Sequence, residues 1–298
     1  MRRYYLSLTL IVLISLSAFP AQGQSLWTRP YTPNQVAVEF LKPSLDTAAP
    51  EDRSVFTSAM FVSGTFLLSA QTALAVDVPV AHYNSTIQAP AGAAPGGGAA
   101  TSAPLGLNLP SGPATIRQTA IGNPYVGLAL APATVPFLVE AGVRLPLASS
   151  QSVARGLGQL TAFDRNEAFA KDVLSGQLLL NYRLGLSRKL SLRLRGGALG
   201  LVDTQADSNH LVARYSAQAW YEGNRLILGT GVTGRAPVGD SGRFTDRGIH
   251  HVGGTVLANF DVVQPGLLLQ VPLDATLSDV VSVVWGVTLS VSLQEVAR

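Results

Sequence analysis

Hydrophobic and polar residues alternate along the last apolar stretch of the chain, VVSVVWGVTLSVSL (280–293). Every second residue from Val281 to Leu293 is apolar, and the residues between them are mostly serine, threonine or glycine. A period of two residues is that of a β-strand, whose side chains point to opposite faces in turn. This stretch therefore predicts a strand whose apolar face meets either a core or lipid.

The same period recurs along the chain and predicts twelve strands. Most of them are longer than the five or six residues that are usual in soluble proteins. About 9–11 residues are enough for a tilted strand to cross the hydrocarbon of a bilayer. The predicted strands are roughly 35–42, 56–68, 72–83, 120–131, 135–147, 173–185, 189–202, 209–221, 225–236, 249–261, 265–273 and 280–293.

The connections between these strands alternate between long and short. The first five fall at 43–55, 69–71, 84–119, 132–134 and 148–172. Outer-membrane barrels have short periplasmic turns and longer extracellular loops, and closure of the sheet leaves no edge exposed to lipid. The pattern therefore predicts an all-β fold, a transmembrane antiparallel up-and-down β-barrel of about 12 strands with long extracellular loops and short periplasmic turns.

One segment also has the length of a transmembrane helix. Residues 55–76 contain no charged residue, and this stretch is long enough for a helical span. They include several serines and threonines, however, and they divide at Ser69-Ala70-Gln71 into two alternating halves. We therefore expect a β-hairpin here.

The N-terminus has the features of a secretory signal peptide. Arg2 and Arg3 precede an apolar core from Leu6 to Leu16, and Ala21-Gln22-Gly23 has the small-x-small pattern of a cleavage site. We expect export to the cell outer membrane. The expected organisation is a signal peptide (1–23), a short N-terminal periplasmic segment (24–34), the barrel (35–293) and a C-terminal tail (294–298).

Composition supports a membrane protein and excludes several other classes. Only 13% of the residues are charged, 47% are hydrophobic, and the net charge is +3. The absence of cysteine excludes disulfides, thiolate metal sites and lipidation on cysteine. No basic run interleaved with aromatic residues points to nucleic acid as a partner. We expect no cofactor.

Charged residues near the middle of the predicted strands fall on the polar parity, away from lipid, where a charge would cost about 2–4 kcal/mol at mid-depth. The face from Val281 to Leu293 should accordingly look into lipid. The charged residues would either select solutes through their field or form a structural ion-pair network that fills the barrel. Twelve strands lie between filled barrels of eight and open ones of sixteen, so both interpretations stand. The predicted lumen-lining residues are Glu39, Asp77, Glu140, Arg144, Arg183, Arg193, Arg195 and Arg214.

Catalytic chemistry has little support in the sequence. His251 with Ser216 or Asn259 is the set that an outer-membrane hydrolase would need, but no nucleophile motif accompanies it. The adjacent His250 and His251 would point to opposite faces of a strand and so cannot form a metal pair. We predict no catalytic or metal site.

Several motifs resemble a family of bacterial outer-membrane β-barrel transporters that includes the phenol meta-pathway-type barrels. These motifs are VAVEFLKPS (36–44), GNPYVGL (122–128), VEAGVRLPLAS (139–149), DRNEAF (164–169), PGLLLQVPLD (265–274) and VVWGVTLSVSL (283–293). The resemblance implies an outer-membrane barrel of a Gram-negative-type envelope that passes small, hydrophobic or aromatic compounds. The chain departs from such barrels in lacking a terminal aromatic residue after Leu293. Its segment 24–34 is also too short for the plug domain of long-chain fatty-acid transporters.

The function expected from these observations is a channel or transporter for small solutes. Its partners would be outer-membrane lipid, the solute and, during biogenesis, the barrel-insertion machinery. The alternative is a non-conducting structural or surface-interaction barrel whose loops 84–119 and 148–172 bind a partner. A lipid-modifying enzyme is a third hypothesis.

Overall fold

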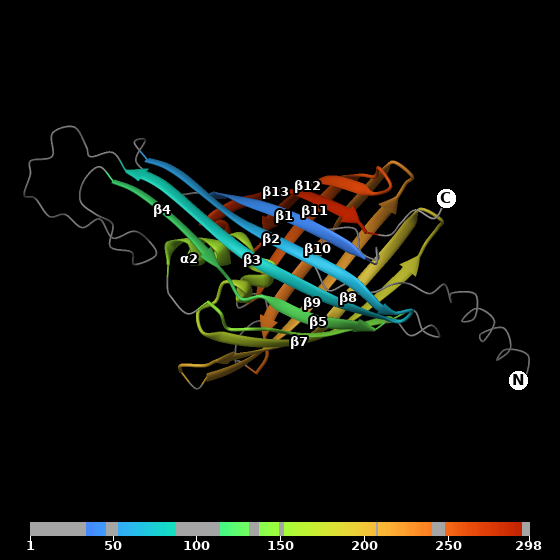
Figure 1. The fold of residues 1–298 in the computed structure, drawn as a ribbon, viewed down its shortest axis with the longest axis horizontal. Coiled ribbons are helices and arrows are strands. Elements are labelled where there is room, and N and C mark those ends of the chain that lie inside the picture. Colours follow the sequence, from blue (N-terminus) through green and yellow to red (C-terminus); the bar gives the residue numbers. More distant parts are fainter. Residues whose placement is uncertain are drawn as a thin grey trace, which may run out of the picture.

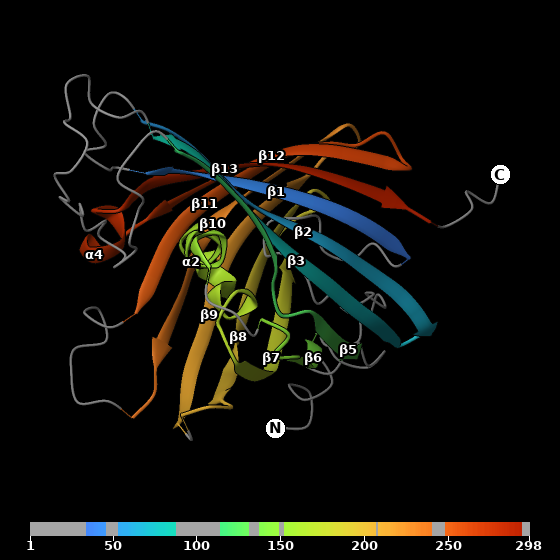
Figure 2. The same cartoon turned by 60° about the vertical axis from the view of Figure 1, so that its left-hand side comes forward.

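The computed structural model describes residues 34–45, 53–87, 114–130, 137–148, 152–206, 208–239 and 248–293. These residues form a single antiparallel sheet that curls into a barrel (Figures 1 and 2). The first strands are β1 (Gln35–Leu45), β2 (Arg53–Ser69), β3 (Thr72–Ile87), β4 (Ala114–Ile121), β5 (Tyr125–Leu130), β6 (Phe137–Arg144) and β7 (Val173–Gly185). The others are β8 (Leu190–Asp203), β9 (Ser208–Glu222), β10 (Leu226–Pro237), β11 (Ile249–Ala258), β12 (Val263–Pro272) and β13 (Val281–Ser292). The helices are α2 (Val153–Thr161), the 3-10 helix η1 (Phe163–Ala168) and α4 (Ala275–Ser278).

The barrel closes because β1 pairs with β2 on one edge and with β13 on the other. Apart from β4 and β5, each later strand pairs with the next along the chain, as in an up-and-down barrel. Gln35, at the start of β1, lies opposite Ser292, at the end of β13, so both ends of the barrel sequence meet at the end with the short turns. The predicted fold class and the long–short alternation of connections are confirmed.

Two of the thirteen strands share one position in the barrel, which leaves twelve. Both β4 and β5 pair with β3, β4 along Val80–Ile87 and β5 along Thr72–Asp77. The prediction of one continuous strand over 120–131 is therefore wrong. Pro124 has no N–H for the ladder, and the residues from Gly122 to Pro124 belong to no strand. In the described part of the chain, β4 pairs with β3 alone, so the wall is interrupted beside it.

Most predicted strand bounds agree with the structure to within a few residues, and β7 (Val173–Gly185) agrees at both ends. Residues 55–76 form parts of the β2–β3 hairpin rather than a helix. The predicted loop 84–119 is shorter than expected, because β3 continues to Ile87 and β4 begins at Ala114. The predicted signal peptide and the tail 294–298 lie outside the described residues. Within the described residues no helix is apolar and long enough to cross a membrane.

The exterior of the barrel is apolar, as the alternation predicts. Trp285, Val287 and Leu289 are exposed, whereas Gly286, Thr288 and Ser290 between them are buried. Leucine and valine continue this exposed surface around the barrel, with Leu267 at 63% exposure on β12. On a closed barrel with a polar interior, such a surface is the one that meets the hydrocarbon of a bilayer. The chain is thus a transmembrane barrel of the outer-membrane type.

The predicted outward orientation fails at one residue, Val281, which is fully buried in the interior. The register between β1 and β13 shifts between Ser44 and Leu45, so that Ser44 lies opposite Val283 and Leu45 opposite Val281. One extra residue in a strand reverses the faces of the residues beyond it. The inward and outward faces therefore exchange at the start of β13.

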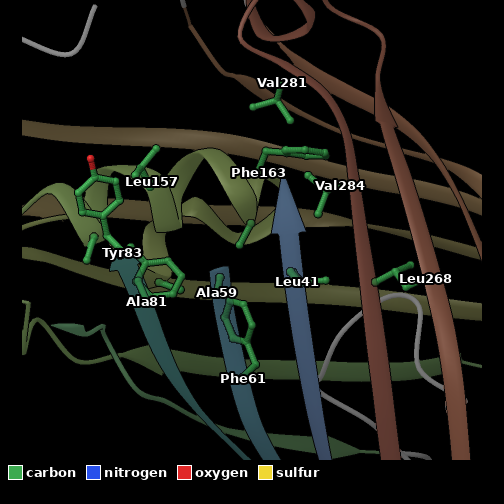
Figure 3. Close-up of a cluster of buried hydrophobic side chains, with 14 residues drawn as sticks. Leu41, Ala59, Phe61, Ala81, Tyr83, Leu157, Phe163, Leu268, Val281 and Val284 are labelled. Atoms are coloured by element: carbon green, nitrogen blue, oxygen red, sulfur yellow. The ribbon is translucent and has the colours of Figure 1, made fainter. Parts of the chain in front are cut away.

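The largest buried apolar cluster lies inside the barrel, between its wall and the loop that follows β6 (Figure 3). Leu41, Ala59, Phe61 and Ala81 contribute to it from β1, β2 and β3. Helix α2 and η1 supply the opposing side chains, including Leu157 and Phe163. The interior is consequently packed around this loop at one level of the barrel.

Candidate functional site: the loop inside the barrel

Residues 152–170, which we call the inner loop, lie within the ring of strands (Figure 2). The loop 148–172 was predicted to be extracellular, and the structure corrects this. Ser152 is the N-cap of helix α2, and its Oγ accepts a hydrogen bond from the backbone N–H of Arg155 (3.3 Å). The loop leaves and rejoins the wall at one point, because the N–H of Asp172 donates to the carbonyl of Ala148 (3.0 Å).

One side of the inner loop is held by apolar contacts. Ala154, Leu157 and Phe169 are buried against the inner faces of β1 to β3. The ring of Phe169 meets that of Phe61 edge-on, with 5.7 Å between centroids. Gly158 lets the Phe169 ring lie close to α2, because a Cβ at this position would be 2.8 Å from that ring. This side is a small hydrophobic core between the loop and the wall.

The opposite side is held by charge, centred on Glu167 of η1. Its carboxylate lies 2.8 Å from Arg235 on β10, 3.6 Å from Arg214 on β9 and 3.8 Å from Arg144 on β6. Only 2% of the Glu167 side chain is exposed. Burial alone would raise the pKa of Glu167, but the three guanidiniums outweigh it and lower the pKa to about 2. One carboxylate thus joins β6 to β9 and β10, which are neighbouring strands.

Arg144 carries the network on to β3. Its Nη2 donates to Oδ2 of Asp77 (2.7 Å), and its Nη1 donates to the carbonyl of Asn123 (3.0 Å). Asp77 and Arg144 were both predicted to face the lumen, and both lie on its inner wall, almost fully buried. Their ion pair lies beside the interruption between β4 and β5.

Asn123 ties the inner loop to this interruption. Its Nδ2 donates to the carbonyls of Glu167 (3.0 Å) and Ala170 (2.7 Å), and its Oδ1 accepts from the N–H of Ala148 (2.8 Å). The side chain therefore joins the outgoing and returning ends of the loop. It is fully buried, and three satisfied hydrogen bonds there fix the position of the loop more firmly than exposed ones would.

Arg165 reaches the other side of the lumen. It donates a hydrogen bond to Glu39 on β1, and its guanidinium lies 3.5 Å from the centroid of the Phe61 ring on β2. The neighbouring Asp164 is buried as well, and this burial raises its pKa to about 6 although Arg214 and Arg235 lower it. Its backbone carbonyl accepts from Arg214 (2.9 Å).

A second group surrounds Glu140 on β6. Its carboxylate accepts from Arg195 (2.7 Å), Gln177 (2.7 Å) and the hydroxyl of Tyr125 (3.2 Å). Gln177 also accepts from Arg214 (2.7 Å). Because Arg214 contacts both groups, the network is continuous from the inner loop to β6 and β8.

A third group lies nearer the short turns and centres on Glu222. The carboxylate accepts from Arg183 (2.8 Å) and Arg193 (2.7 Å). The guanidinium of Arg193 also lies 4.3 Å from the Trp220 ring, a distance at which cation and ring attract. This group makes no contact with the inner loop that we observe among the described residues.

The structure therefore places all eight predicted residues in the interior and distributes them over three groups. Sequence reasoning missed five partners: Asp164, Arg165, Glu167, Glu222 and Arg235. Parity within the predicted strand 225–236 points Arg235 inward together with Thr233 and could have identified it. Asp164, Arg165 and Glu167 belong to the DRNEAF motif, but the sequence pattern did not predict where this motif lies in the barrel.

The space left between η1 and the wall is a void of about 10 Å³, enough for roughly one water molecule. Asp164, Arg195, Arg214, Arg235 and His251 are among the residues around it. His251 faces the ring of Phe163 (4.8 Å between centroids), and His250 points away from it, with its Nδ1 2.7 Å from Asp274. A void of this volume is too small to hold a solute larger than water.

The barrel is similar to solved outer-membrane proteins. The COG4313 outer membrane channel from Pseudomonas putida F1 superposes with a TM-score of 0.51 at 12% identity, covering 91% of this chain and 99% of that one. The NanC porin gives 0.48 at 7% identity over 87% and 100% of the two chains. The TodX deltaS2S3 mutant monoaromatic hydrocarbon channel gives 0.44 at 12% identity over 87% and 90%. No protein-family model matches the sequence, and no curated protein does. At such identities the first of these similarities shows a shared fold, that of an outer-membrane barrel.

Proposed function

We propose that this protein is an outer-membrane channel through which a small solute diffuses, and that the inner loop closes it in the observed conformation. The observation that carries the proposal is the nature of the obstruction. A polar, charge-lined interior is blocked by a single loop that joins the wall at one point, Ala148–Asp172, rather than by side chains from every strand. A barrel built only for rigidity has no need of such a loop.

The similarity in fold to a channel from Pseudomonas putida F1 supports this proposal. The solute could be hydrophobic or aromatic, as the sequence resemblance implies, or polar, as the lining suggests. The alternative is a surface-interaction barrel. This alternative is weakened, because one of the two loops proposed to bind a partner contains residues 152–170, which lie inside the barrel.

The proposal can be tested with a variant that lacks the obstruction. Because Ala148 and Asp172 are hydrogen-bonded neighbours (3.0 Å), a short Gly-Ser linker can replace residues 152–170 without moving β6 or β7. We expect this shortened variant to show large, stable conductance steps in a planar bilayer. The full-length protein should show small or infrequent ones.

Folding of both proteins would be established first, by the different gel mobility of heated and unheated samples. A shortened variant that is folded but electrically silent would reject the channel. Liposome swelling with uncharged sugars would extend the measurement from ions to solutes.

A further inference from the structure

The two sides of the inner loop differ in how easily each can separate from the wall. On the side of β1 to β3 the contact combines an apolar surface, including Leu157 and Phe169, with the buried ion pair of Arg165 and Glu39. Separation there would break this pair and also expose the apolar surface, at about 25 cal/mol per Å². On the other side the loop is held by ion pairs of Glu167 with Arg214 and Arg235. A charged contact separates at little net cost when another charged group replaces the lost partner.

This charged contact, which we call the seam, lies between η1 and the inner faces of β8 to β11. It already contains the small void, and it is rich in guanidinium groups. The residues that line it are Asp164, Arg195, Arg214, Tyr215, Ser216, Thr233, Gly234, Arg235, Ile249 and His251.

We propose that the seam is an anion site and the route past the inner loop, and that a small carboxylate opens it by replacing Glu167 at Arg214 and Arg235. This inference rests on the proposed channel function and names its solute class. The occupant of the site in the closed conformation is itself a carboxylate, bound at 2.8 Å to Arg235. A solute carboxylate offers the same two oxygens to the same guanidinium forks.

The balance of charge in the seam favours an anion. Arg195, Arg214 and Arg235 contribute three positive charges to its lining, and Asp164 is the one carboxylate there besides the neighbouring Glu167. Once Glu167 is displaced, Arg214 and Arg235 lose a shared partner, and only an anion can replace it without leaving buried charges unpaired. A cation would meet the guanidiniums and be repelled.

The seam is continuous with the group around Glu140. Arg195 and Arg214 line the seam and are about 13% exposed at the side chain. Arg195 donates to Glu140 and Arg214 to Gln177. An anion that enters the seam therefore meets guanidiniums whose present partners it can replace.

The test uses the full-length protein in a planar bilayer with benzoate as the probe and benzyl alcohol as its uncharged counterpart. We expect benzoate to raise the open probability at least about tenfold, the factor that corresponds to one hydrogen bond to a charged group. Benzyl alcohol should have no such effect. This comparison requires no substitution, so it stands even if a variant fails to fold.

Two variants locate the site. Glu167→Gln removes the carboxylate from the seam and should give channels that open without benzoate and prefer anions, measured as a reversal potential in a KCl gradient. Glu222→Gln is the matched control, because it removes a luminal carboxylate that pairs with Arg183 and Arg193 outside the seam. It should respond to benzoate as the unaltered protein does.

Equal responses to benzoate and benzyl alcohol would overturn the proposal, as would opening by Glu222→Gln to the same extent as by Glu167→Gln. A full-length protein that ignores benzoate while the shortened variant conducts would overturn the anion site and leave the channel intact. Silence of both the full-length protein and the shortened variant would reject the channel itself.

Discussion

Arg165 on η1 forms an ion pair with Glu39 on β1, a residue 126 positions earlier in the chain. Both side chains are almost fully buried, at 7% and 2% exposure. On the other side of η1, Glu167 pairs with Arg235 on β10. A helix of six residues therefore spans the lumen and is fixed at both sides by charge.

The apolar exterior predicts a cost for charge that depends on position along the strand. Leu267→Arg places a guanidinium at the middle of β12, where lipid would surround it, and should lower the free energy of unfolding by about 2–4 kcal/mol. Leu186→Arg is the control, because Leu186 has the same exposure of 63% but lies beyond the end of β7 (Val173–Gly185), before β8 begins at Leu190. Unfolding in urea from lipid vesicles would measure both, and equal effects would contradict the membrane orientation.

Asn123 is expected to determine how firmly the inner loop stays in place. Asn123→Ala removes hydrogen bonds to two carbonyls and one N–H of the loop and leaves those groups buried without it. Each unsatisfied group costs about 1–3 kcal/mol, so we expect a less stable loop and a higher open probability in a planar bilayer.

Asn181→Ala is the matched control for this substitution. Asn181 also faces the interior, from β7, but its buried Nδ2 has no hydrogen-bond partner among the described residues. The prediction fails if the two variants have the same open probability, or if the Asn123→Ala loop resists protease as well as the unaltered loop does.

Two glycines in α2 allow a test of the apolar side of the loop. A Cβ on Gly158 would lie 2.8 Å from the Phe169 ring and 3.0 Å from the Ala81 Cβ. Among the described residues outside the helix itself, no atom lies within 4 Å of a Cβ on Gly156. Gly158→Val should therefore force α2 away from β3 and cost about 1–3 kcal/mol through overpacking. Gly156→Val changes the intrinsic helix propensity in the same way but causes no such overpacking, so it should cost far less.

The midpoint temperature of the gel-mobility shift would measure this difference. If Gly156→Val and Gly158→Val lowered it equally, α2 would not pack on β3 as described. Conductance of the same samples would show whether loosening this side alone opens the lumen.

Asp164 should make the barrel less stable as the pH rises. Burial raises its pKa from 3.8 to about 6, so the folded state binds more protons than the unfolded state between these values. Stability then falls as the pH rises through this window, by about 3 kcal/mol in all, since one pKa unit corresponds to about 1.4 kcal/mol. Asp164→Asn should be more stable than the unaltered protein at pH 8 and equal to it below pH 4.

Glu167→Gln should show the opposite dependence. The pKa of Glu167 is lowered to about 2. Its ionised carboxylate therefore stabilises the folded state fully above the ordinary pKa of a glutamate, and this stabilisation is lost as the pH falls toward about 2. The variant should be the less stable protein at pH 8 and approach the unaltered one in acid. Urea unfolding at a series of pH values would measure both variants, and parallel curves would contradict the assigned environments.

The twelve strands of the barrel can be predicted from the sequence because a membrane restricts the residues that each strand may carry. Every backbone group in hydrocarbon must be paired within the sheet, and the side chains that face hydrocarbon are predominantly apolar, so the alternation from Val283 to Leu293 can be recognised locally in the sequence. The same rule placed Glu39, Asp77 and Glu140 inside. A Pro in a strand pattern is also a local signal, and Pro124 could have indicated the break between β4 and β5.

The tertiary structure alone determined what occupies the lumen. The segment 152–170 forms helices α2 and η1 rather than a strand, so the two-residue period does not apply to it. Its position depends on side chains that converge from β1, β3, β6, β9 and β10. Parity states that Arg144 and Arg214 point inward, but not that both meet Glu167. Such pairings are set by the curvature of the closed barrel, which brings residues far apart in the chain to the same level of its interior.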